Sequence, residues 1–310
     1  MGKFTGMLLL SDYDNTFHYT EGALMGGGMP PVPRRNLEAV RRWIGEGGRF
    51  TIATGRALTA FRERAEGLPI NAPAIVDNGG AIYDLAEERY LVKRFLPDEA
   101  LEHLARAAEA FPGISIEMYH EGPLLQVVHP GKWNDQHAQL TGVPYEVVER
   151  VEAGTVPLPL AKALFAAEMA ELRKLREYMA GQGWEAFYEM IFSSDHLLEL
   201  TAKGADKGGM ARLLKEMCGC ERMICVGDHA NDLPMLRAAD RAFAPANAIR
   251  EVLDSGAEIV GHCLDGAVAD VVEILEREGR LVPGGTAEQE DAACISRNIG
   301  AIISAVRTTA

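Results

Sequence analysis

Two aspartates follow a short apolar run near the start of the chain. Residues 7–10 read MLLL, and Asp12 and Asp14 come after Ser11, two residues apart. An unpaired carboxylate in apolar surroundings is costly enough that it protonates instead. These two acids are therefore either solvated turn residues or groups that hold a positive charge.

Three further polar clusters have a similar setting. Thr54-Gly55-Arg56 directly follows the apolar run at 50–53. Lys207-Gly208 stands at the start of an expected helix that begins near Asp206, and Lys203 is a weaker competitor for its role. The last cluster comes just after the run MICV and consists of Asp228, Asn231 and Asp232. Asn78, before Gly79-Gly80, follows one more such run and is typical of a turn or a substrate contact.

The chemistry that fits these residue types is phosphoryl transfer. Carboxylates at this density repel one another unless a cation lies among them, and oxygen ligands without a His or Cys cluster favour Mg²⁺. A threonine hydroxyl, a lysine and free backbone N–H groups are ligands for phosphate. The sequence contains neither a Walker loop nor a Gly-x-Ser-x-Gly elbow. A carboxylate nucleophile is the remaining candidate.

Alternating strands and helices would bring the four clusters together. Apolar runs near 7–10, 49–53, 73–76 and 222–226 alternate with helical patterns such as RRNLEAVRRWIG, and this predicts a parallel sheet with crossover helices. In open α/β sheets, ligands bind outside the carboxyl ends of the strands. The predicted fold class is therefore α/β, with a Rossmann-like, doubly wound parallel sheet.

The texture of the chain changes near residue 85. Residues 86–192 mix helical stretches with alternating ones such as GISIEMYH, which predicts an inserted α+β cap. The core is then discontinuous and consists of residues 1–85 plus 193–310. The tail after Gly279 holds one amphipathic pattern through Ile295, Ile299 and Val306, typical of a further helix.

Composition narrows the classes of partner and compartment. The chain has 310 residues, 47% of them hydrophobic, and a formal net charge of −14 with no dense basic run, which argues against nucleic-acid binding. The N-terminal apolar run is too short for a signal peptide or a membrane span. Five cysteines without a metal or redox spacing fit free thiols, so we expect a cytoplasmic protein with no membrane partner. The sequence leaves the oligomeric state open.

The four motifs together resemble those of the haloacid dehalogenase-like phosphatases. The resemblance lies in SDYDNTF, IATGR, ADKGGMARLL and VGDHANDLPML, in that order, and extends over the core from about residue 7 to 278. It is closest to the Cof-type branch, whose α/β cap (type IIB) is inserted between the second and third motifs. Asn15 departs from the family, because many relatives carry glycine there.

The resemblance implies a role for each site residue. Asp12 would be the nucleophile and a Mg²⁺ ligand. Asp14 would be the general acid and base, with its backbone carbonyl on the metal. The other roles are as follows: Asp228 as the third metal-linked carboxylate; Thr54, the N–H of Gly55, Lys207 and Asn231 as phosphate ligands; Asp232 and Arg56 as supporting residues, with Asp232 bonding Lys207; and Asn78 as a possible substrate contact. For Arg56, a direct contact with phosphate and a purely structural capping role are equal alternatives. Helix capping is an equal alternative for Asn231, and His229 is expected to be a bystander.

These roles imply a Mg²⁺-dependent phosphatase that hydrolyses a small phosphorylated metabolite, with a sugar phosphate as the favoured class. Leaving-group contacts are expected in the cap, with these candidates: Tyr119, His120, His129, Trp133, Asn134 and His137. A phosphomutase using the same site is the first alternative. A noncatalytic module that carries a phospho-aspartate is the second.

Overall fold

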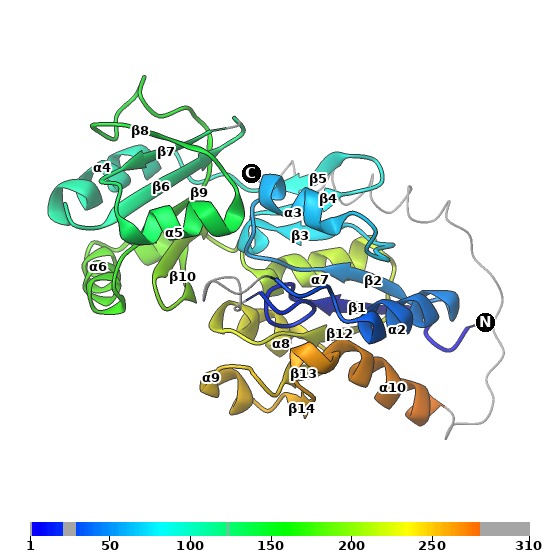
Figure 1. Cartoon of the computed structure of the whole chain (residues 1–310). Helices are drawn as coiled ribbons and strands as arrows, with labels where there is room; N and C mark the ends of the chain where they lie inside the picture. The colour runs from blue at the N-terminus through cyan, green and yellow to red at the C-terminus, as the bar shows by residue number, and fades with distance from the viewer. Residues whose placement is uncertain (1, 21–28, 123, 280–310) are drawn as a thin grey trace.

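The computed structural model describes residues 2–20, 29–122 and 124–279 of the chain (Figure 1). At its centre lies a parallel sheet with the strand order β14-β13-β12-β1-β2. Its strands are β1 (Met7–Ser11), β2 (Arg49–Ile52), β12 (Arg222–Val226), β13 (Arg241–Pro245) and β14 (Glu258–Val260). Because β1 pairs with β12 on one side and β2 on the other, the first aspartates leave from the middle of the sheet.

Helices cover both faces of this sheet, as a doubly wound fold requires. Residues of β1 alternate between the faces, so Leu9 packs in one core cluster and Leu8 and Leu10 in another. Helices α2 (Arg34–Gly45) and α10 (Ala267–Gly279) belong to the first cluster, through side chains such as Trp43 and Val271. Helices α7 (Lys207–Met217) and α8 (Leu233–Ala238) belong to the second. The predicted fold class is confirmed.

Three antiparallel strands extend the core beyond β2. They are β3 (Ala74–Val76), β4 (Ala81–Asp84) and β5 (Arg89–Lys93), and a parallel bridge between Ala53 and Ile75 joins them to the end of β2. Two short helices complete the core, α3 (Leu58–Ala65) after β2 and α9 (Arg250–Leu253) after β13. The 3₁₀ turn Asp77–Gly79 lies between β3 and β4, and a second one, Ala230–Asp232, precedes α8.

The inserted segment forms a second sheet with its own helices, which Figure 1 shows as a separate lobe. The strand order is β10-β11-β9-β6-β7-β8. Its elements are α4 (Ala100–Ala110), β6 (Ser115–His120), β7 (Leu125–Val128), α5 (Lys132–Thr141), β8 (Tyr145–Val147), β9 (Leu160–Ala166), α6 (Met169–Gly181), β10 (Tyr188–Ser194) and β11 (Leu197–Ala202). Side chains such as Phe165 and Leu198 pack with α4 and α6 on one face, while Leu164 and Ala166 lie on the other.

Strand pairing changes from one sheet to the other near, but not at, the predicted boundaries. β5 pairs with β4 of the core although it lies after residue 85, and β10 and β11 pair within the second sheet although they extend past residue 192. The division into a core and a cap stays a prediction.

Two other sequence predictions concern the chain ends and membranes. The helix expected around Ile295, Ile299 and Val306 lies outside the described residues. Within the part of the chain that the structure describes, no helix has the length and apolar character needed to cross a membrane.

Candidate active site

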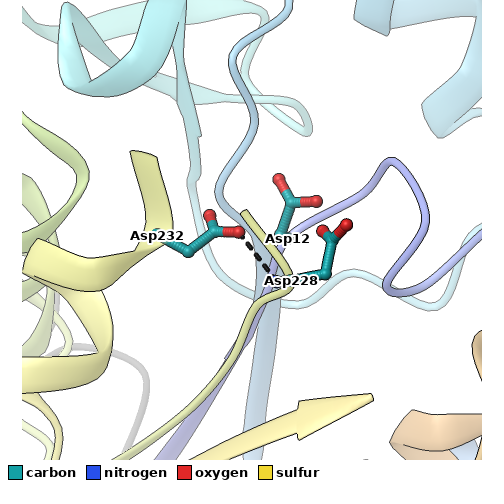
Figure 2. Close-up of side chains that lie close together, drawn as sticks. All are labelled: Asp12, Asp228 and Asp232. Atoms are coloured by element: carbon teal, nitrogen blue, oxygen red, sulfur yellow. Dashed lines mark hydrogen bonds between the residues drawn. The ribbon is translucent and has the colours of Figure 1, made fainter. Parts of the chain in front are cut away.

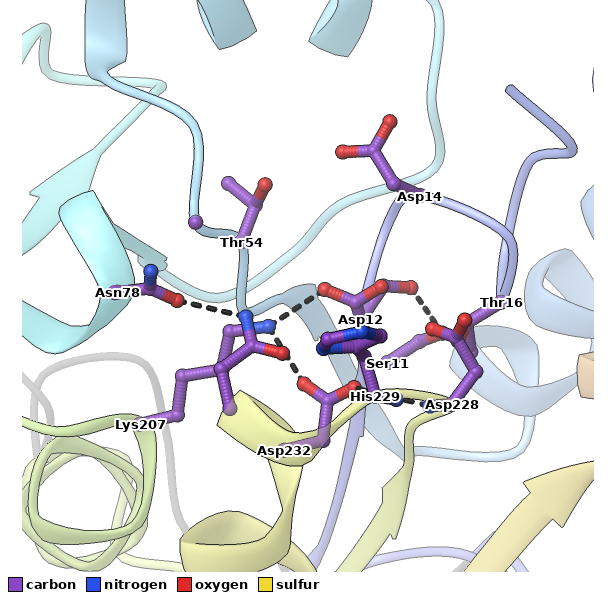
Figure 3. A network of polar contacts seen from close by, with 12 residues as sticks. Ser11, Asp12, Asp14, Thr16, Thr54, Asn78, Lys207, Asp228, His229 and Asp232 are labelled. Atoms are coloured by element: carbon purple, nitrogen blue, oxygen red, sulfur yellow. Dashed lines mark hydrogen bonds and ion pairs between the residues drawn. The ribbon is translucent and has the colours of Figure 1, made fainter. Parts of the chain in front are cut away.

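The four polar clusters of the sequence meet at the carboxyl ends of β1, β2 and β12 (Figure 3). Lys207 is the central contact, because its Nζ lies 2.6 Å from Asp12 Oδ1 and 2.6 Å from Asp232 Oδ1. The lysine is 0% exposed and begins α7, whose N-cap is Asp206. Burial alone would lower the pKa of Lys207, but Asp12 and Asp232 raise it further than burial lowers it, so the ammonium stays charged.

Three buried acids surround this lysine. One carboxylate oxygen each of Asp12, Asp228 and Asp232 lies within 4.8 Å of the others. Figure 2 shows the three side chains lying close together. Burial raises the pKa of Asp12 to about 7, with Lys207 opposing the shift and Asp232 adding to it. Burial raises the pKa of Asp228 as well, and the neighbouring Asp12 adds to the shift. Without a cation, these carboxylates oppose each other's ionisation.

The three acids differ in how many of their carboxylate oxygens already accept hydrogen bonds. Both oxygens of Asp232 are engaged, Oδ1 by Lys207 and Oδ2 by the backbone N–H groups of Asp228 and His229 at 2.9 and 3.0 Å. The predicted contact between Asp232 and Lys207 is therefore confirmed. Among the described residues the carboxylate of Asp228 accepts a hydrogen bond only from the hydroxyl of Thr16, at 2.8 Å, and that of Asp12 only from Lys207, so each has an oxygen that could bind a metal.

Asp14 lies apart from this cluster. Arg56 binds it through two hydrogen bonds, Nε to Oδ2 at 2.8 Å and Nη2 to Oδ1 at 2.6 Å. Burial raises the pKa of Asp14, but Arg56 lowers it more, so the net shift is downward. Figure 3 shows its side chain separated from the carboxylate of Asp12. The side chain is therefore no part of the acid cluster, and the metal contact through its backbone carbonyl stays a prediction.

The Thr54-Gly55-Arg56 turn offers donors to the same space. Thr54 is fully buried, and its hydroxyl accepts the N–H of Arg56 at 3.1 Å, which leaves its own proton available for donation. Among the described residues the N–H of Gly55 has no hydrogen-bond acceptor. This unpaired N–H is what a phosphate-binding turn requires.

The Asp77–Gly79 turn contacts the Thr54-Gly55-Arg56 turn through two backbone hydrogen bonds. Asn78 Oδ1 accepts a hydrogen bond from Asn231 Nδ2 at 2.8 Å, while Asn78 Nδ2 is buried without a partner in the described part of the chain. Asn78 has φ +56° and Gly79 φ +96°, and a side chain at Gly79 would lie 2.2 Å from the backbone of Asp206. The turn therefore joins the second, third and fourth motifs, and Asn231 contacts Asn78.

The cap candidates have varied partners. Asn134 Oδ1 accepts the N–H of Gly131 and caps α5. Trp133 stacks on His196 with ring centroids 3.3 Å apart. The others also lie among cap residues: Tyr119 and His137 bind Glu117, His120 binds Gln126, and His129 Nδ1 is buried without a partner in the described residues. None of these contacts reaches the acids of the core.

Sequence reasoning missed two residues of this region. Thr16, just after the first motif acids, donates to Asp228, 212 positions away. Lys162 of the cap lies 3.0 Å from the carbonyl oxygen of Gly55. An apolar strand interrupted by one lysine, LAKALFA, is the only local signal for Lys162, and nothing local indicates its partner.

Comparison with known proteins gives one family. The model of the haloacid dehalogenase-like hydrolases matches residues 21–272. A 5-amino-6-(5-phospho-D-ribitylamino)uracil phosphatase of Bacillus subtilis is 24% identical over 271 residues, which cover 79% of this chain and 92% of that protein. An HMP-PP phosphatase of Cronobacter sakazakii is 26% identical over 245 residues, covering 74% and 84% of the two chains.

A solved structure has the same fold. A haloacid dehalogenase-like hydrolase from Bacteroides thetaiotaomicron superposes with a TM-score of 0.71 at 23% identity, over 88% of this chain and 99% of its own. The match of the family model takes in the second to fourth motifs and the inserted segment between them. The chain belongs to the haloacid dehalogenase-like hydrolase family, as its four motifs predicted.

Proposed function

We propose that this protein is a Mg²⁺-dependent phosphatase that hydrolyses a small phosphorylated metabolite through a phospho-aspartate on Asp12. The observation that carries the proposal is the position of Lys207, whose ammonium lies between Asp12 and Asp232 with Asp228 beside them. A buried cation next to a carboxylate nucleophile is arranged to neutralise a transferred phosphoryl group.

The acid cluster fits Mg²⁺ by the chemistry of its donors. Within the part of the chain that the structure describes, the cluster contains only carboxylates, without His or Cys, and Asp12 and Asp228 each have an oxygen that accepts no hydrogen bond. Hard oxygen ligands of this kind, completed by phosphate oxygens and water, suit Mg²⁺. When bound, the ion would offset the charge of the phosphoryl oxygens and of the two carboxylates.

The protein residues would carry out the hydrolysis in two steps. In the first, Asp12 attacks phosphorus, the bond to the leaving oxygen breaks, and Asp14 supplies the proton that this oxygen takes up. Because Arg56 lowers the pKa of Asp14, the acid must take up this proton and break its ion pair with Arg56 before the step. In the second, Asp14 accepts a proton from water as the water attacks the phosphorus on Asp12, which releases inorganic phosphate and the free carboxylate. The phosphoryl oxygens would be bound by Thr54, the N–H of Gly55 and Lys207. The edge of the site next to them would be formed by Asn231 and Asn78.

The direct test measures inorganic phosphate released from a panel of phosphorylated metabolites, with Mg²⁺ and after its removal by EDTA. We expect release that requires Mg²⁺ and is abolished in Asp12→Asn. Asp254→Asn is the matched control, because Asp254 is an exposed acid that pairs with Arg250 on the surface. An Asp12→Asn variant that keeps turning over substrate would overturn the mechanism.

Asp14 is tested by the leaving group. General acid catalysis contributes about 10²–10⁴-fold for a poor leaving group and little for p-nitrophenolate. Asp14→Asn should therefore slow alkyl phosphates far more than p-nitrophenyl phosphate. Equal loss on both substrates would contradict the assignment.

The same panel separates the alternatives. A phosphomutase would return the phosphoryl group to a sugar and depend on a bisphosphate activator, and a noncatalytic module would accumulate phospho-aspartate without release. Sugar phosphates remain our favoured substrate class because of the resemblance of the motifs to the Cof-type branch. The names of the relatives above support the broader class of small phosphorylated compounds. We also propose a cytoplasmic location, which suits a chain whose five cysteines have no metal or redox spacing.

A further inference from the structure

A buried lysine of the second sheet contacts the core next to the candidate phosphate site. Lys162 lies on β9 and is 2% exposed. Its Nζ donates to the carbonyl oxygen of Gly55 at 3.0 Å and to Glu199 Oε2 at 2.9 Å, and it lies 4.7 Å from the centre of the Tyr119 ring. Glu199 satisfies the charge, so the bond to Gly55 is an additional contact that the ion pair itself does not need.

This contact completes a set of three. The carbonyl of Thr54 accepts the N–H of Asn78 at 3.1 Å, and the carbonyl of Arg56 accepts the N–H of Asp77 at 2.9 Å. The carbonyl between them, that of Gly55, accepts Lys162. Each peptide of the turn is thus held by its oxygen, two by the core and one by the inserted segment. Because a peptide is planar, holding the C=O of Gly55 also fixes the N–H of Arg56, which donates to the hydroxyl of Thr54, while the N–H of Gly55 is fixed through the carbonyl of Thr54.

The surroundings make the lysine difficult to replace by water. Apolar side chains of the second sheet, including Leu164 and Ala166, pack against Ala60 of α3, the helix that starts directly after the turn. Arg64 of the same helix donates to the carbonyl of Leu140 at 3.1 Å. Lys162 therefore acts within a packed contact between α3 and the second sheet, where an unpaired carbonyl would be costly.

We propose that Lys162 is a positioning residue of the active site, which sets the Thr54-Gly55-Arg56 turn in the shape that binds phosphate. The proposal deepens the proposed function and rests on it. Lys162 touches no reacting atom. It acts through Gly55, and so makes a complete phosphate site depend on contact between the inserted segment and the core.

This role predicts a loss that does not depend on the leaving group. If Lys162 shapes the phosphate site, removing it should lower kcat/KM by the same factor for every substrate. It should also weaken the binding of inorganic phosphate. If Lys162 instead contacted the leaving group, kcat/KM would fall for large substrates and would stay unchanged for p-nitrophenyl phosphate. A misplacement of about 1 Å in an active site costs up to about 100-fold, so we expect a loss of roughly 10–100-fold in kcat/KM.

The test variant removes both charges, because Lys162→Met alone would leave Glu199 buried and unpaired. Lys162→Met with Glu199→Met is compared with Lys174→Met with Glu171→Met, an ion pair exposed on α6 of the same segment. The control should behave as the wild type. Glu199→Gln keeps Lys162 and an acceptor for it, so it should retain most of the activity. Lys162→Gln with Glu199→Gln, a polar pair with a shorter donor, replaces the methionine pair if that variant does not fold.

Two measurements keep this test separate from that of the proposed function. The first compares kcat/KM for p-nitrophenyl phosphate and for a hydrolysed sugar phosphate. The second titrates inorganic phosphate by calorimetry in the presence of Mg²⁺, which needs no turnover. Equal losses on both substrates and weaker phosphate binding support the proposal. A folded variant within twofold of the wild type in both measurements overturns it, and so does a loss confined to large substrates. A wild-type protein that hydrolyses nothing would overturn the proposed function. The phosphate titration would still test whether Lys162 shapes the phosphate site.

Discussion

Arg56 holds the carboxylate of Asp14 in a two-point ion pair, with hydrogen bonds of 2.8 and 2.6 Å. Such bidentate pairs fix geometry as well as charge. The arginine side chain is 6% exposed, and its guanidinium also lies 5.9 Å from the centre of the Tyr13 ring. Because Arg56 follows Thr54 and Gly55 directly, the turn that would bind phosphate also orients the proposed acid.

Removing this pair tests whether the orientation serves catalysis. Arg56→Met should lower kcat/KM for alkyl phosphates by about tenfold more than for p-nitrophenyl phosphate, because only poor leaving groups need a proton from a well-placed acid. Steady-state assays on the two substrate types give the ratio. Arg250→Met, at an exposed arginine that pairs with Asp254, is the control. A variant that gained activity on alkyl phosphates would show that the pair restrains Asp14 instead of positioning it.

Thr16 provides a test of the metal site that leaves every carboxylate in place. Its hydroxyl donates to Asp228 Oδ1 at 2.8 Å, and both residues are buried. Groups that orient a metal ligand typically matter by about 10–100-fold in metal affinity. Thr16→Val, which conserves shape, should raise the Mg²⁺ concentration needed for half-maximal activity by that factor. Thr155→Val, at an exposed turn, should leave it unchanged. An unaltered Mg²⁺ requirement in Thr16→Val would argue against Asp228 as a ligand.

Asn78 is expected to contribute to phosphate binding through its Nδ2, which has no hydrogen-bond partner among the described residues. Its φ of +56° favours Asn or Gly, so Asn78→Gly removes the side chain without backbone strain, whereas Asn78→Ala adds strain. A hydrogen bond to a charged group is worth about 1.5–3 kcal/mol. Asn78→Gly should therefore weaken the binding of inorganic phosphate about tenfold or more, as measured in a competition assay. Binding as tight as in the wild type would leave Asn78 only its structural contact with Asn231.

The burial of His103 leads us to expect that the stability of the second sheet depends on pH. It stacks on Trp184 with centroids 4.5 Å apart, its Nδ1 lies 2.8 Å from the hydroxyl of Tyr188, and burial lowers its pKa from 6.5. The unfolded chain then binds the proton more readily than the folded one, so stability is full above pH 6.5 and falls as the pH decreases below it. Urea unfolding should show this loss between pH 7 and pH 5, and His103→Phe should reduce it. The same pH dependence in both proteins would exclude His103 as a cause.

The sequence by itself determined the framework of the site. Apolar runs set the strands, and the rule that ligands bind at the carboxyl ends of parallel strands placed Asp12, Thr54 and Asp228 at one edge. Lys207 was found because it opens a helix in the third motif. These features are local, since strand ends and helix starts are written in consecutive residues, and the order of the motifs was enough to indicate the family.

Only the tertiary structure decided which side chains touch. Thr16 and Asp228 are 212 positions apart, Asn78 and Asn231 153, and Gly55 and Lys162 107. Arg56 was predicted as a phosphate contact or a supporting residue, and that role stays a prediction, but no local pattern indicated that its side chain binds Asp14. Side-chain partners at such separations depend on how the two sheets pack against each other, and packing follows from the shape of the whole chain. No stretch of consecutive residues contains that information.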